Sequence, residues 1–104
     1  MIVSALSRKT AIANQEEQGR RANRLLERLQ PFLERQTGFA GMELQWGEDG
    51  YLTELTRWRT QEDCRRYVRE GAAATAATMS DALLPTAPYP NGTWSRKTHE
   101  EAAQ

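Results

Sequence analysis

The spacing of apolar side chains in the first third of the chain predicts a strand followed by a helix. Residues 2–7 are mostly apolar and partly β-branched, which is typical of a short strand. Beyond Asn14, apolar residues recur every three or four positions, as on one face of a helix. These residues are Ala22, Leu25, Leu26, Leu29, Phe32 and Leu33. Asn14 and Glu17 predict a capping box at the start of this helix, and we expect Pro31 to bend it.

The next segment predicts a β-hairpin. Gly38 ends the first helix, and residues 39–46 then alternate between two faces, as in a strand. The sequence GEDG at residues 47–50 is a strong turn signal. Residues 51–59 are the second strand of this predicted hairpin.

The rest of the chain predicts a second helical region and a last strand. Thr60, with Asp63 three positions later, predicts an N-terminal cap. We expect Gly71 to break or kink this helix, and the Ala-rich residues 72–84 favour a further helical segment. Three prolines then mark a loop, and residues 93–98 predict the last strand.

The resulting order is β-α-β-β-α-β, which predicts an α+β fold. It fits a ferredoxin-like sandwich, in which a four-stranded antiparallel sheet carries the helices on one face. We expect one domain over residues 1–98 and a polar, frayed tail over residues 99–104.

The pairing of the hairpin decides which side chains share a face of the sheet. We predict that Trp46 lies opposite Tyr51, although a slip of one residue would mix the two faces. One face then holds Ala40, Met42, Leu44, Trp46, Tyr51 and Leu55, and the other holds Phe39, Glu43, Gln45, Leu52, Glu54, Thr56 and Trp58.

In this register Glu43 lies directly opposite Glu54, an unfavourable placement for two like charges. If both were shielded from water, one would hold its proton more tightly than a free carboxylic acid. The pair is therefore a candidate acid–base site. The alternative is that both side chains reach solvent, or pair with arginines such as Arg57.

Composition and charge narrow the classes of function. Lys and Arg number 14, as do Asp and Glu, so the formal net charge is zero. This balance argues against nucleic-acid binding and against attraction to anionic membranes. No apolar stretch approaches the length of a membrane span, the N-terminus lacks the order of a signal peptide, and the one cysteine cannot form an internal disulfide. We therefore expect a cytoplasmic protein in which Cys64 is a small buried packing residue.

Several of these features resemble the antibiotic biosynthesis monooxygenase domain. They are the sequence GFAGMEL at residues 38–44, the hairpin, Trp58, and a Thr-capped helix that contains Tyr67. The resemblance extends over residues 1 to about 84. It implies a dimeric α+β barrel, in which the sheets of a homodimer face each other and each monomer has a pocket between its sheet and its helices.

The resemblance also assigns the two faces of the sheet. The face with Met42, Leu44 and Leu55 would meet the partner, and the face with Glu54 and Trp58 would line the pocket. No metal and no cofactor is implied for the oxygenases of this family.

Characterised relatives include cofactor-free oxygenases of aromatic polyketides or quinols, and haem-degrading enzymes. The haem-degrading type typically has an Asn on the first strand, a Trp at the end of the third, and a His on the following helix. This chain has only the Trp, at Trp58, and its one histidine, His99, lies in the predicted tail. Haem degradation of that type is therefore disfavoured. In the polyketide oxygenases an Asn tends to precede the Trp by one strand turn, and Glu54 stands there instead.

The first hypothesis is a cofactor-independent monooxygenase of a small aromatic molecule. A glutamate would remove a substrate proton, and an aromatic wall would exclude water. The candidate catalytic residues are Glu54, Trp58 and Glu43, and the candidate substrate-binding residues are Phe39, Leu52, Tyr67 and Met79. The alternatives are a non-catalytic small-molecule-binding dimer, and an isomerase or cyclase that uses the same acid–base pair without oxygen. The aromatic residues could equally be core residues.

Overall fold

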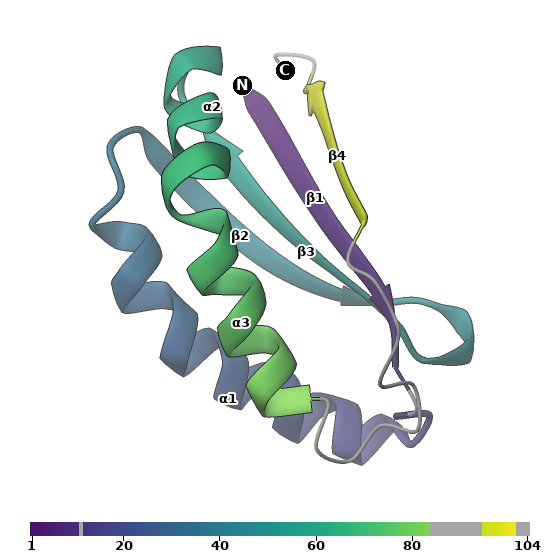
Figure 1. Cartoon of the computed structure of the whole chain (residues 1–104). Helices are drawn as coiled ribbons and strands as arrows, with labels where there is room; N and C mark the ends of the chain where they lie inside the picture. The colour runs from purple at the N-terminus through teal and green to yellow at the C-terminus, as the bar shows by residue number, and fades with distance from the viewer. Residues whose placement is uncertain (11, 84–94, 102–104) are drawn as a thin grey trace.

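The computed structural model describes residues 1–10, 12–83 and 95–101. Its elements are β1 (Ile2–Lys9), α1 (Gln15–Glu34), β2 (Phe39–Trp46), the 3₁₀ turn η1 (Glu48–Gly50), β3 (Tyr51–Trp58), α2 (Gln61–Glu70), α3 (Ala72–Leu83) and β4 (Ser95–Glu100). The strands form one antiparallel sheet in the order β2-β3-β1-β4, and the three helices lie on one of its faces (Figure 1). This arrangement confirms the predicted α+β ferredoxin-like class, with α2 and α3 together in the place of the second helix.

The helices begin where the sequence predicts them to begin. The side-chain oxygen of Asn14 accepts a hydrogen bond from the backbone N–H of Glu17 (3.1 Å), and that of Thr60 accepts one from the N–H of Asp63 (3.1 Å). The carboxylate of Glu17 pairs with arginines of α1 instead of completing the capping box. Helix α1 continues through Pro31, and Gly71 separates α2 from α3.

The core lies between the sheet and the helices. Leu25, Leu29 and Leu33, which belong to the predicted apolar stripe of α1, are at most 1% exposed. Cys64 is also buried in this core, as predicted. None of the described helices is long and apolar enough to cross a membrane.

The predicted register of the hairpin is wrong by one residue. Trp46 lies opposite Leu52, and Glu43 lies opposite Leu55. The reason is the length of the turn: Gly47 donates its N–H to the carbonyl of Tyr51 (2.7 Å), so only residues 48–50 form the loop. Such three-residue loops place their last residue in the left-handed region, and this residue is Gly50, with φ of 77°.

This register changes the composition of the two faces. Met42, Leu44 and Trp46 pack against the core on the helix side instead of facing a partner. Glu43 lies on the opposite face, together with Leu55. Near the start of β2 a bulge separates Phe39 from Gly41, and it keeps Phe39 opposite Trp58 on the helix side.

The last strand extends two residues further along the chain than predicted. Strand β4 covers Ser95–Glu100, so it includes His99 and Glu100, which the sequence assigned to the tail. The predicted strand residues Thr93 and Trp94 lie outside the described residues, as does Leu84 at the end of the predicted helix.

Gly38 packs against the N-terminal cap of α2. Its φ is 80°, and a Cβ at this position would lie 2.1 Å from Oδ2 of Asp63. That carboxylate is held in place, because it accepts hydrogen bonds from the hydroxyl of Thr60 (2.9 Å) and the guanidinium of Arg66 (3.0 Å). The turn before β2 therefore fits against α2 only with glycine at this position.

We expect Gly38→Ala to lower the free energy of unfolding by about 2 kcal/mol. The new methyl group adds left-handed backbone strain and displaces a hydrogen-bonded carboxylate. Urea denaturation followed by circular dichroism measures the change. Gly19→Ala is the matched control: no atom lies within 4 Å of its Cβ position inside α1, so this substitution should raise stability by about 0.5–1 kcal/mol. A Gly38→Ala protein as stable as the parent would contradict the packing of Gly38 on Asp63.

Candidate active site

Glu54 lies in the middle of β3, with its side chain on the helix side of the sheet. It is opposite Leu6 of β1 and Leu44 of β2, and it is 0% exposed. Neither carboxyl oxygen accepts a hydrogen bond from a described residue. Burial of the charged form raises the pKa of Glu54 from 4.5 to about 7, and the positive charge of Arg96 partly opposes this shift. The carboxyl group is therefore able to change its protonation state near neutral pH.

Arg96 of β4 brings a positive charge to the same face. It lies opposite Leu6 on the other side of β1, so Glu54, Leu6 and Arg96 form one row across the sheet. Its guanidinium donates a hydrogen bond to the hydroxyl of Ser4 and lies 5.6 Å from the centre of the Tyr67 ring. Sequence reasoning missed Arg96, because the polar sequence SRKTHE of β4 gives no apolar alternation from which its face could be predicted.

Three aromatic side chains form a continuous cluster beside this row. The rings of Trp58 and Tyr67 stack with centroids 4.5 Å apart, and Phe39 meets Trp58 edge-on at 5.7 Å. The indole N–H of Trp58 donates to the hydroxyl of Thr56 (3.0 Å), which satisfies its only polar atom. Trp58 is 0% exposed, so without a bound substrate it is a core residue.

Tyr67 stays protonated at neutral pH. Burial, followed by the nearby charge of Glu54, raises the pKa of Tyr67 to about 12. Its hydroxyl donates to Thr75 of α3 (2.9 Å), and Thr75 donates to the carbonyl of Gly71 (3.2 Å). These bonds fix Tyr67 across the break between α2 and α3. Thr75 was not predicted, because a threonine within an Ala-rich helix carries no signal of its partner.

Solved structures with the same fold as this chain belong to the antibiotic biosynthesis monooxygenase type. The chain is similar to SnoaB, a cofactor-independent oxygenase from Streptomyces nogalater, at 18% identity and a TM-score of 0.60 over 99% of this chain and 95% of that one. It is similar to a putative antibiotic biosynthesis monooxygenase from Deinococcus radiodurans, at 13% identity and a TM-score of 0.62 over 100% and 95%. The fold is that of the antibiotic biosynthesis monooxygenase-type proteins.

The monooxygenase-type fold also includes a haem-degrading enzyme. MhuD from Mycobacterium tuberculosis, whose structure holds two haems in its active site, matches at 16% identity and a TM-score of 0.62 over 100% of this chain and 98% of that one. No family model matches the sequence, and no curated protein matches it. At these identities the likeness establishes the fold and not the reaction.

Within this monooxygenase-type fold the candidate residues fall into two groups. Glu54 and Trp58 lie on the helix side, together with the predicted substrate-binding residues Phe39, Leu52, Tyr67 and Met79. Glu43 lies on the other face, where its carboxylate accepts a hydrogen bond from Arg57 (2.8 Å). The predicted opposition of Glu43 and Glu54 is therefore wrong, and the alternative of an arginine partner holds for Glu43.

The helix-side group can carry proton transfer. A carboxyl with a pKa near 7, in apolar surroundings, can take a proton from a weakly acidic carbon or phenol and return it later. The guanidinium of Arg96 supplies positive charge on the same face, where a substrate anion would form. Among the described residues, no three His, Cys, Asp or Glu side chains are grouped so that they could hold a metal ion.

Proposed function

We propose that this protein is a cofactor-independent monooxygenase of a small aromatic molecule, such as a polyketide or a quinol, with Glu54 as the base. The observation that carries the proposal is the buried carboxyl of Glu54, whose pKa of about 7 suits a base that works near neutral pH. The fold shared with a cofactor-independent oxygenase supports it.

In an anthrone substrate, the reacting group is an acidic CH₂ between two aromatic rings. The Glu54 carboxylate takes one proton, and the carbanion passes one electron to O₂. The two radicals combine to a peroxide anion, which takes the proton back from Glu54; the hydroperoxide then loses water and leaves a ketone, so the CH₂ and O₂ become C=O and H₂O. Trp58 and Phe39 supply the aromatic wall, Leu52 and Met79 add apolar surface, and the ring of Tyr67, whose hydroxyl donates to Thr75, extends the wall.

The proposal includes a homodimer. One face of the sheet carries no helix (Figure 1). Leu55 lies on this face opposite Glu43, which pairs with Arg57. A second copy of the chain would cover this face and leave the helix side of each sheet for the substrate.

Oxygen uptake with an anthrone and with a naphthoquinol tests the reaction. Light scattering measures the mass of the protein used in the assay. We expect a dimer, with twice the 11.8 kDa of one chain. We expect Glu54→Gln to lower kcat about a hundredfold, because the amide cannot accept the substrate proton. Glu48→Gln, at an exposed position in η1, is the matched control and should keep the parent rate.

Three outcomes would count against the proposal. A Glu54→Gln protein as active as the parent would remove Glu54 from the role of base. A parent protein that retains an aromatic ligand through purification, yet consumes no oxygen with it, would favour a non-catalytic binding dimer. Turnover of such a ligand without oxygen would favour an isomerase or cyclase.

A further inference from the structure

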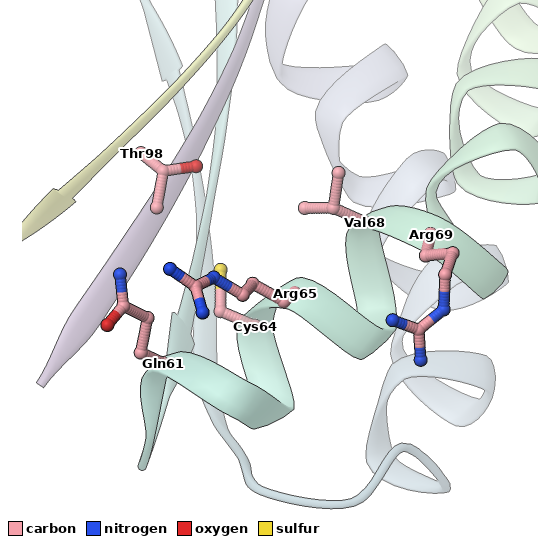
Figure 2. A pocket seen from close by; sticks show the side chains of 6 residues that line it. All are labelled: Gln61, Cys64, Arg65, Val68, Arg69 and Thr98. Atoms are coloured by element: carbon pink, nitrogen blue, oxygen red, sulfur yellow. The ribbon is translucent and has the colours of Figure 1, made fainter.

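A groove of about 400 Å³ opens between α2 and β4 (Figure 2). This volume lies within the range of small-molecule sites. The groove is lined by Gln61, Cys64, Arg65, Val68, Arg69 and Thr98. The first four recur at the spacing of one helix face, and Thr98 comes from the edge strand of the sheet.

Arg65 has no charged partner within the part of the chain that the structure describes. The acids near it on α2 bind other arginines: Arg66 pairs with Asp63 (3.0 Å) and with Glu62 (3.5 Å). In Figure 2 the guanidinium of Arg65 extends between Gln61 and Thr98, in front of Cys64. The groove therefore presents two guanidinium groups, of which that of Arg69 pairs with Glu70 (3.3 Å), and two neutral polar side chains; no carboxylate belongs to its lining.

Val68 and Cys64 supply the apolar part of the lining. Val68 is 38% exposed, so its side chain is accessible to a ligand in the groove. Cys64 forms part of the buried wall, and burial raises the pKa of its thiol, so it stays neutral. The groove thus joins an apolar wall to one unmatched positive charge.

We propose that this groove binds a small aromatic carboxylate. Arg65 holds the carboxylate through paired N–H donors, Gln61 and Thr98 offer further hydrogen bonds, and Val68 and Cys64 contact the ring. An inorganic anion would leave the apolar wall uncovered, and a neutral ring would leave Arg65 without a partner. The proposal does not depend on the oxygenase reaction, because it concerns binding alone.

The test compares 2-naphthoate with its neutral analogue 2-naphthamide. Each is titrated into the ¹⁵N-labelled full chain, and the backbone amide peaks are followed by NMR. We expect 2-naphthoate to shift peaks of α2 and β4 and to bind at least about tenfold more tightly than 2-naphthamide. Raising the salt concentration should weaken the binding, because Arg65 is exposed.

Variants separate this groove from other sites. Arg65→Gln should weaken 2-naphthoate binding about tenfold, and Arg65→Lys should give an intermediate affinity, because it keeps the charge and loses the paired donors. Arg24→Gln, an equal loss of charge on the exposed face of α1, should bind like the parent. Glu54→Gln should also bind like the parent, so loss of oxygenase activity and loss of this site are distinguishable.

Three results would overturn the proposal. They are equal affinities for the two ligands, an Arg65→Gln protein that binds 2-naphthoate like the parent, and the absence of any shift in α2 and β4 at millimolar ligand. Circular dichroism measures the melting temperatures of Arg65→Gln and the parent. If the two temperatures are equal, the loss of binding is due to the missing side chain and not to a change in the fold.

Discussion

Replacing Trp58 by alanine is expected to lower the free energy of unfolding by about 4 kcal/mol. The indole is 0% exposed, and its ring contacts both Tyr67 and Phe39. The substitution leaves a cavity between the sheet and α2, and it also leaves the hydroxyl of Thr56 without the indole donor. The cost therefore combines lost apolar contact with a cavity that the rigid sheet fills poorly.

Urea denaturation followed by far-ultraviolet circular dichroism measures this change. Tyr51→Ala is the control: it removes an aromatic side chain from the same strand, but Tyr51 is 48% exposed. Its effect should stay below about 1 kcal/mol. A loss of less than about 1 kcal/mol for Trp58→Ala would show that the indole lines an open pocket in solution and is not part of a packed core.

This result bears on the proposed oxygenase. A substrate that reaches Glu54 has to share the space beside Trp58 and Tyr67, so the helices must move relative to the sheet when it binds. The break at Gly71 offers a place for such movement. The methyl group of an alanine there would lie 3.0 Å from the ring of Tyr67, so a larger residue at the break would crowd that ring.

The elements could be predicted because their signals are local. Asn14 and Thr60 cap helices through residues three positions away, and the GEDG turn joins two strands of clear alternation. The register could not be predicted in the same way, because it depends on whether Gly47 belongs to the loop or to the ladder. That choice is made by tertiary contact: the carbonyl of Gly50 accepts from the hydroxyl of Thr10 (2.7 Å), far away in the sequence.

The difference between local signals and tertiary contacts also explains which residues of the candidate site could be predicted. Glu54 and Trp58 are four positions apart on one strand, so their common face follows from the sequence alone. Arg96 joins them only through the pairing of β4 with β1, which no local pattern encodes. The error on Glu43 has the same origin, because a slip of one residue moves a side chain to the other face of the sheet.

The stability of the parent protein is expected to fall by about 3 kcal/mol as the pH rises from about 4.5 to about 7. Burial raises the pKa of Glu54 in the folded state to about 7, whereas the unfolded chain has the ordinary value of 4.5. Between these values the folded state binds more protons than the unfolded state, so each rise in pH favours unfolding. Above pH 7 both states have lost the proton and this contribution no longer changes, so the shift of about 2.5 pH units gives the whole effect.

Glu54→Gln should remove this dependence, because the amide does not titrate. The measurement is a series of urea denaturations from pH 4.5 to pH 8 on the parent and the variant; the difference between the two free energies should grow in favour of the variant by about 3 kcal/mol over this range. Glu48→Gln is the control, since an exposed glutamate should leave the pH dependence of the parent unchanged. Parallel curves for the parent and Glu54→Gln would show that water or a positive charge satisfies the carboxylate in solution. A parent that loses stability as predicted keeps a destabilising residue in its core, and proton transfer at Glu54 gives a physical reason for keeping it.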